Sequence, residues 1–106
     1  MENNEYCVMI TEPAQTDLME IDDYISLELK APVAAKNLLL SIYEVIQKLS
    51  FSPQGYSKVR DDRLGAQGYR WIGVKNYVIF YIIDAKSKTV RVERILYGRR
   101  NWKHIL

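Results

Sequence analysis

The sequence is poor in residues that cross-link a chain or ligate a metal. It contains a single cysteine, Cys7, and a single histidine, His104, among its 106 residues. One cysteine cannot close a disulfide within the chain, which excludes a secreted scaffold held together by disulfides. There is also no cysteine–histidine cluster of the kind that binds zinc, and we expect neither a metal nor another cofactor. We expect Cys7 to be a small, buried hydrophobic residue.

Long hydrophobic runs are missing as well. No apolar run approaches the roughly 20 residues that a membrane-spanning helix needs. The acidic start of the chain, residues 1–5, lacks the basic and then apolar pattern of a signal peptide. Hydrophobic residues nevertheless make up 48% of the chain and charged residues 26%. We therefore expect one folded domain over residues 1–106, soluble, cytoplasmic and without a membrane partner.

Positive charge is scarce in the first half of the chain and abundant in the second. Residues 1–53 carry three lysines and no arginine against nine acids, which gives a net charge of −6. Residues 54–106 carry twelve basic residues against four acids, which gives +8, so the two halves sum to the overall +2. This polarity predicts an acidic flank and a basic working surface.

The spacing of apolar residues predicts the element order β-α-α-β-β-β. Apolar residues first recur at helical steps of three and four and later in β-prone stretches. The predicted strands and helices are, in chain order, strand 6–11, helices 14–29 and 35–49, and strands 69–74, 77–83 and 89–97. Lys30-Ala31-Pro32 separates the helices, and residues 54–67 resemble a loop. The turn Lys75-Asn76 is expected to rely on the tolerance of Asn76 for positive φ.

These elements predict an α+β fold, a two-layer sandwich. Short turns join the last three strands, so the four-stranded sheet must be mostly antiparallel. The two helices form a hairpin that buries its apolar stripes on one face of the sheet. The continuously apolar strand 77–83 is typical of a central strand that is covered on both faces. We expect the second face of the sheet to be free and bordered by the basic half of the chain, with a short tail at the C-terminus.

Basic and aromatic residues are concentrated near the C-terminus and on a neighbouring strand. They are Arg91, Arg94, Tyr97, Arg99, Arg100, Trp102, Lys103 and His104, with Tyr69 and Arg70 on the neighbouring strand. Arginines bind phosphate bidentately and aromatic rings stack on unpaired bases, as a surface for single-stranded RNA requires. The alternative is that these arginines only keep an exposed sheet face soluble. Five positive charges within 14 residues, however, repel one another unless an anionic partner is present.

Histidine is the residue type that gains and loses a proton near neutral pH, and His104 is the single histidine of the sequence. It could therefore act as a general acid or base beside the arginines. The alternative interpretation, that a lone histidine near a terminus is only a surface residue, is the more common case.

Several stretches resemble the RelE/ParE superfamily of toxins, which are the toxic halves of type II toxin–antitoxin modules and are also called plasmid stabilisation proteins. The similar stretches are residues 10–14, 69–84 and 92–102, the last ending in Gly98-Arg99-Arg100-Asn101-Trp102. The resemblance covers nearly the whole chain and implies the same β-α-α-β-β-β fold. It also implies a cognate antitoxin whose C-terminal segment wraps the toxin and masks its basic surface.

The resemblance leaves two targets open, because RelE-like members cut mRNA on the ribosome and ParE-like members inhibit DNA gyrase. For a nuclease, Arg70 matches a basic residue that follows a tyrosine on the second strand, and Arg99 or Arg100 matches an arginine after the last long strand. The sequence departs from the nuclease pattern at Val78 and Ile72, where basic residues are expected. It departs again near residue 105, where a tyrosine is expected.

Three functional interpretations follow. The first, which we slightly favour at this point, is a ribosome-dependent mRNA endonuclease that causes growth arrest. Its predicted catalytic residues are Arg70, Arg99, Arg100 and His104, and its predicted binding residues are Tyr69, Arg91, Arg94, Tyr97, Trp102 and Lys103. The second is a gyrase inhibitor without chemistry of its own. The third is an inactive member kept for binding the antitoxin.

Overall fold

The computed structural model describes residues 5–106, so residues 1–4, where no signal peptide was expected, lie outside the described part. Its elements follow the predicted order, with short helical segments added. They are β1 (Cys7–Ile10), α1 (Glu12–Asp23), the π-helical η1 (Tyr24–Glu28), α2 (Pro32–Lys48), the 3₁₀ turn η2 (Pro53–Gly55), α3 (Asp62–Ala66), β2 (Arg70–Val74), β3 (Tyr77–Asp84), β4 (Thr89–Tyr97) and α4 (Trp102–Ile105). The predicted β-α-α-β-β-β order is confirmed.

The four strands form one sheet in the order β1-β4-β3-β2. β2 and β3 pair antiparallel, as do β3 and β4, whereas β1 lies parallel to β4. The sheet is thus mostly antiparallel, as predicted, and the long strand β3 is an inner strand. The helical hairpin returns the chain to the end of the sheet where β1 begins. β2 and β4 therefore run in the same direction as β1, and β1 is parallel to β4.

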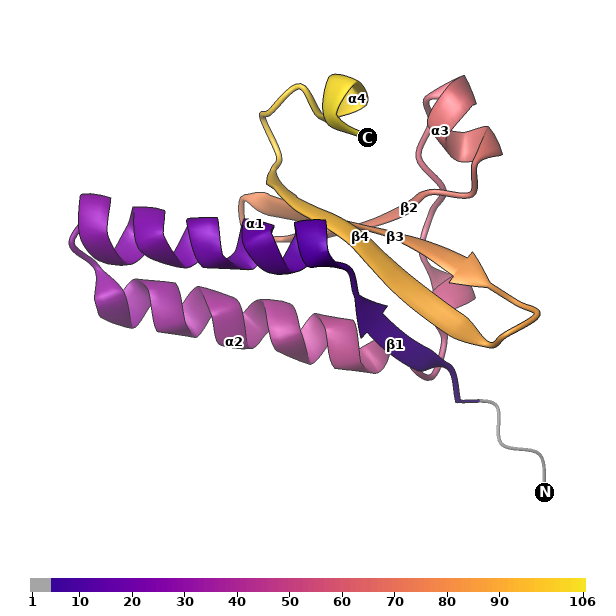
Figure 1. Ribbon diagram of the computed structural model, residues 1–106, viewed down its shortest axis with the longest axis horizontal. Coiled ribbons are helices and arrows are strands. Elements are labelled where there is room, and N and C mark those ends of the chain that lie inside the picture. The colour runs from indigo at the N-terminus through magenta and orange to yellow at the C-terminus, as the bar shows by residue number, and fades with distance from the viewer. Residues whose placement is uncertain (1–4) are drawn as a thin grey trace.

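The helical hairpin covers one face of the sheet and forms the main core (Figure 1). α1 begins where the side chain of Thr11 accepts a hydrogen bond from the main-chain N–H of Ala14 at 3.3 Å, and Pro13 suits the first turn. Pro32 is likewise in the first turn of α2, although the preceding Ala31 offers no side-chain cap. The predicted break between the helices is confirmed, and the α+β sandwich with it.

The second face of the sheet is not free. α3 and α4 lie on this side, opposite the hairpin (Figure 1). A second cluster packs there, with Val59 and Leu64 from residues 57–66 against Phe80 and Leu96 of the sheet. The prediction of a free face is therefore wrong where α3 and α4 cover it. The loop expected over residues 54–67 is also wrong in part, because Asp61 caps a short helix by accepting from the N–H of Leu64 at 3.1 Å.

Two local predictions are also wrong. Cys7 is exposed rather than buried, because β1 is an edge strand and Val8 and Ile10, not Cys7, face the core. In the turn between β2 and β3 the positive φ, 54°, falls on Lys75 and not on Asn76. The backbone there adopts a left-handed conformation at a residue that has no special tolerance for it.

Tyr81 gives the main core a measurable dependence on pH. Its side chain is fully buried, and its hydroxyl donates to the main-chain oxygen of Pro53 at 2.6 Å. Burial raises the pKa of Tyr81 to about 12. A tyrosine in the unfolded chain titrates near pH 10, so between pH 10 and pH 12 only the unfolded state loses this proton. This contribution to stability is present below pH 10 and falls away as the pH rises toward 12.

We therefore expect the free energy of unfolding to fall by about 1 kcal/mol more in the wild-type protein than in Tyr81→Phe between pH 8 and pH 11. Urea unfolding at the two pH values measures this difference, and the other tyrosines cancel in the comparison. Equal losses in the two proteins would contradict the assignment to Tyr81.

Candidate functional site

The two predicted arginines after β4 lie in an exposed loop. Residues 98–101 lead from β4 into α4, and both Arg99 and Arg100 are exposed. At the start of the loop, the N–H of Gly98 donates to the main-chain oxygen of Asn76 at 2.8 Å. Further along, the N–H of Arg100 donates to the main-chain oxygen of Tyr97 at 2.9 Å. This end of the sheet therefore presents two unburied guanidinium groups from an ordered backbone.

Arg70 lies elsewhere. It stands opposite Tyr81 in the sheet and so points to the face that the hairpin covers. Its Nη1 donates to the main-chain oxygens of Gln54 at 3.2 Å and Tyr56 at 2.5 Å. Tyr97, the last residue of β4, pairs with Tyr77 of β3. Tyr77 lies four residues from Tyr81 along β3, so the two positions are about 13 Å apart. The structure does not bring Arg70 together with Arg99 and Arg100.

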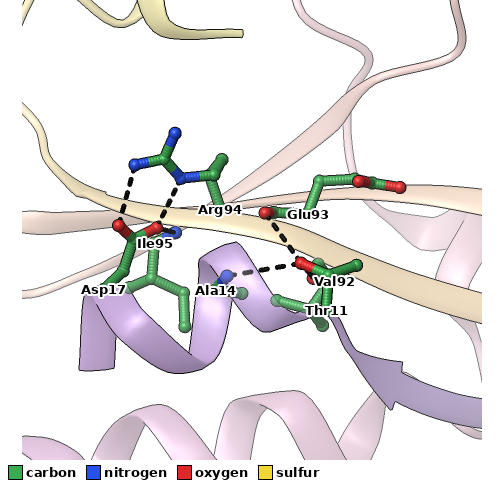
Figure 2. A network of polar contacts seen from close by, with 7 residues as sticks. All are labelled: Thr11, Ala14, Asp17, Val92, Glu93, Arg94 and Ile95. Atoms are coloured by element: carbon green, nitrogen blue, oxygen red, sulfur yellow. Dashed lines mark hydrogen bonds and ion pairs between the residues drawn. The ribbon is translucent and has the colours of Figure 1, made fainter. Parts of the chain in front are cut away.

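Arg94 is engaged inside the protein (Figure 2). Its Nε and Nη2 donate to the two carboxylate oxygens of Asp17 at 2.7 and 2.8 Å, and the N–H of Ile95 donates to the same carboxylate at 2.9 Å. Asp17 is only 4% exposed. The hydrogen bonds that Arg94 donates to the carboxylate of Asp17 raise the pKa of Arg94. Arg91 is likewise paired, with Glu93 at 2.9 Å.

Sequence reasoning missed Asp17 as the partner of Arg94. β1 ends opposite Val92, and beyond that point α1 takes its place along β4. A bulge at Glu93, where the register shifts, accompanies this change of partner. Asp17 is 77 positions from Arg94 in the chain, and no local pattern signals a contact over that distance.

The aromatic residues of the predicted site are partly used in packing. Trp102 lies with its ring 5.3 Å from that of Phe80, and Tyr69 packs on the same cluster, where burial raises its pKa. Lys103 and His104 are exposed on α4, and Lys103 approaches Asp61 at 4.0 Å. Neither aromatic ring is freely presented for stacking on a base.

A groove of about 760 Å³ opens between the hairpin and the end of the sheet. Ile21, Tyr24, Ile25 and Leu29 form the helical wall with Asp17, Glu20, Ala31 and Ala34, and Asn76, Tyr77, Ile95, Tyr97 and Arg100 form the opposite wall. The rings of Tyr77 and Tyr97 meet edge to face at 5.7 Å. Of the predicted residues, the groove contains Tyr97 and Arg100, and it also contains Asp17, the unpredicted partner of Arg94.

Among residues 5–106, no group of three or more histidine, cysteine, aspartate or glutamate side chains could hold a metal ion. Over the same residues no helix is long and apolar enough to cross a membrane.

The fold is similar to that of chains in two solved toxin–antitoxin structures. The RelBE2 toxin–antitoxin complex from Mycobacterium tuberculosis matches with a TM-score of 0.63 and 22% identity, covering 88% of this chain and 98% of that one. The chromosomal ParDE toxin–antitoxin system of P. aeruginosa matches with a TM-score of 0.69 and 20% identity, covering 90% and 98%. A comparison with curated protein sequences finds no match.

The fold and the sequence together define the class. This chain is a toxin of the RelE/ParE superfamily from a type II toxin–antitoxin system, as the resemblance implied. The family described as the ParE toxin of the type II toxin-antitoxin system, parDE, matches residues 8–102. The chain belongs to the ParE toxin family.

Proposed function

We propose that this toxin arrests growth by binding DNA gyrase, with no catalytic step of its own, and that a cognate antitoxin neutralises it. The observation that carries the proposal is the separation of Arg70 from Arg99 and Arg100. RNA cleavage needs charge stabilisation and proton transfer to converge on one phosphate, with donors about 3 Å from it. Arg70 instead bonds to the main-chain oxygens of Gln54 and Tyr56. This separation favours a gyrase inhibitor over the ribosome-dependent nuclease that the sequence slightly favoured.

The exposed end of the sheet supports binding to a protein. Arg99, Arg100 and Lys75 are exposed there, beside one another across the Gly98–Asn76 hydrogen bond. A cluster of cations on an ordered loop attracts an acidic protein surface and speeds the encounter with it. We assign this basic end, defined as Lys75, Arg99 and Arg100, to the contact with gyrase.

The groove supports the binding of an antitoxin. Its volume of about 760 Å³ is within the range of typical ligand sites, and its walls are mainly apolar and aromatic. Arg100 belongs to both the groove and the basic end. A polypeptide segment that fills the groove therefore also covers Arg100, and this explains how one antitoxin segment blocks the contact with the target. Two solved structures to which the chain is similar are of toxin–antitoxin complexes or systems.

Purified gyrase tests the proposal. We expect the toxin to inhibit supercoiling of a relaxed plasmid, and its expression to induce the SOS response while transcripts stay intact. Normal supercoiling at saturating toxin, with mRNA cut at A-site codons in arrested cells, would instead identify a nuclease. Expression without any growth defect would identify an inactive member.

Removal of the two arginines sharpens the test. We expect Arg99→Ala with Arg100→Ala to weaken inhibition of gyrase at least tenfold, because it removes two of the three cations of the basic end. The matched control, Lys36→Ala with Lys48→Ala, removes the same charge from the exposed surface of α2. An equal effect of both pairs on the supercoiling assay would mean that only net charge matters, which would contradict a specific basic contact.

A further inference from the structure

Strand β2 carries a glycine in its middle that the fold does not require. Gly73 pairs regularly with Val78 of β3, without a bulge, and its φ is not positive. Beyond the adjacent residues, a Cβ at this position would have one neighbour within 4 Å, Cζ3 of Trp71 at an ordinary contact distance of 3.9 Å. Glycine weakens the interior of a strand and often marks a place where another backbone approaches closely. Because Gly73 is also exposed, the approach that it permits comes from outside the chain.

The outer edge of β2 is open at this glycine. β2 is the outermost strand of the sheet, and the N–H of Trp71 donates outward, to the main-chain oxygen of Ser57 at 3.2 Å. In the described part of the chain, residues 57–59 follow this edge only as far as Trp71. Alternate residues of a strand direct their main-chain groups to the same side. The N–H and the oxygen of Gly73 therefore also point outward, where another strand can pair with them.

An exposed tryptophan lies next to the open edge. Trp71 is directly opposite Phe80 in the sheet and so points to the second face, away from the hairpin. Phe80 is 1% exposed beneath Trp102, whereas Trp71 is 43% exposed. Tryptophan is among the residues that most often dominate the binding energy of protein interfaces. The ring of Trp71, with the space left by Gly73 beside it, can receive an apolar side chain from a pairing strand.

Lysines flank the open edge at both ends. Lys58, which is exposed, lies opposite Arg70 at one end, and the exposed Lys75 follows β2 at the other, where the basic end begins. Lysines on an edge strand oppose pairing with a second copy of the same edge, because that pairing brings like charges together. The same lysines attract a strand that carries carboxylates. The charge of this edge therefore selects an acidic partner over a second copy.

We propose that an acidic, extended segment of gyrase adds to the open edge of β2 as a further strand. Its main chain pairs with the N–H and the oxygen of Gly73, an apolar side chain packs on Trp71, and its carboxylates face Lys58 and Lys75. The edge continues into the basic end through Lys75, whereas the groove assigned to the antitoxin lies on the hairpin side of the sheet. This inference rests on the proposed binding of gyrase and adds the mode of contact.

Gly73→Val tests the proposal without removing a contact of the fold. Valine favours strands, and its Cβ meets only the movable ring of Trp71, so we expect a melting temperature at or above that of wild type. Inhibition of supercoiling should nevertheless weaken at least tenfold, because the valine methyl groups fill the space that the partner needs. Trp71→Ala should weaken it by a similar factor.

Two matched controls separate the edge from general effects of the substitutions. Cys7→Val places a valine at an exposed position of β1, the opposite edge strand. Tyr43→Ala removes an aromatic ring of α2 that is 44% exposed, almost the same fraction as Trp71. Both controls should inhibit supercoiling within twofold of wild type. If Gly73→Val does not fold by circular dichroism, Trp71→Ala and amide exchange decide the result.

Amide exchange in the complex with gyrase reports on the strand pairing itself, and exchange over residues 71–75 should slow at least tenfold. If Arg99→Ala with Arg100→Ala weakens inhibition but the edge variants inhibit like wild type, with exchange unchanged, the added strand is overturned and the basic end stands. If the edge variants still inhibit gyrase but no longer bind the antitoxin encoded next to the toxin gene, the edge belongs to the antitoxin and the inference is wrong. If the wild type does not inhibit gyrase, the proposed function fails together with this inference.

Discussion

Asp17→Ala is expected to lower the free energy of unfolding by about 3 kcal/mol. Asp17 accepts three hydrogen bonds, two from Arg94 and one from the N–H of Ile95, and is almost fully buried. Alanine leaves the Arg94 guanidinium and the N–H of Ile95 without these partners. Loss of one partner of a buried ion pair typically destabilises by about 3–5 kcal/mol. We take the lower end of that range, because the side chain of Arg94 is 25% exposed and water can reach part of it.

Urea unfolding of the wild type and four variants, Asp17→Ala, Arg94→Leu, the double variant and Asp23→Ala, measures this effect. Asp23→Ala is the matched control, since Asp23 is an exposed acid of the same helix, and it should stay within about 0.5 kcal/mol of wild type. The double variant Asp17→Ala with Arg94→Leu should be less destabilised than the sum of the two single variants, because it no longer leaves a buried charge unpaired. An Asp17→Ala protein as stable as the Asp23→Ala control would show that the ion pair contributes nothing.

The same ion pair links stability to the groove. Asp17 and Ile95 lie in the two walls of the groove, and the hydrogen bond between them joins α1 to β4 at its base. Thr11 adds a second link, since its hydroxyl lies 3.1 Å from the main-chain oxygens of Val92 and Glu93 (Figure 2). The helical wall therefore keeps a fixed distance from the sheet wall.

Local patterns were enough to predict the fold. Helical spacing over residues 14–49 and β-prone stretches over 69–97 gave the order of elements, because each pattern depends on neighbours within one or two turns. The sequence even held a sign of the second core. A strand that is apolar at every position, as residues 77–83 are, must be covered on both faces, and Phe80 is indeed covered by α3 and α4. The expectation of a free face overlooked this sign, because the short helices that supply the cover have no periodicity to detect.

The candidate site was predicted less well, for a different reason. Composition located the basic segment 91–104, but it could not separate exposed arginines from paired ones. Arg99 and Arg100 are exposed, whereas Arg94 is bound by an acid that is distant in the chain. The groove could not be predicted either, because its walls meet only after the hairpin folds back on the sheet. Ile21 and Ile25 keep the four-residue spacing of an α-helix, so the sequence pattern did not indicate the π-helical segment η1.

Trp102→Ala is expected to lower the free energy of unfolding by about 2–3 kcal/mol and to weaken toxicity. The ring of Trp102 packs on Phe80, which is 1% exposed, and joins the second core on that face of the sheet. Truncation of a fully buried tryptophan costs about 3–5 kcal/mol, and Trp102 is only partly buried. The residue also closes the far end of the loop 98–101, so its loss frees Arg99 and Arg100 from their ordered backbone.

Urea unfolding measures the loss of stability, and amide exchange over residues 98–106 measures the release of the loop. The control Trp102→Phe should retain most of the stability and most of the protection from exchange. If Trp102→Ala releases α4 but leaves the proposed inhibition of gyrase unchanged, the basic end does not need an ordered loop, and its arginines act only through their charge.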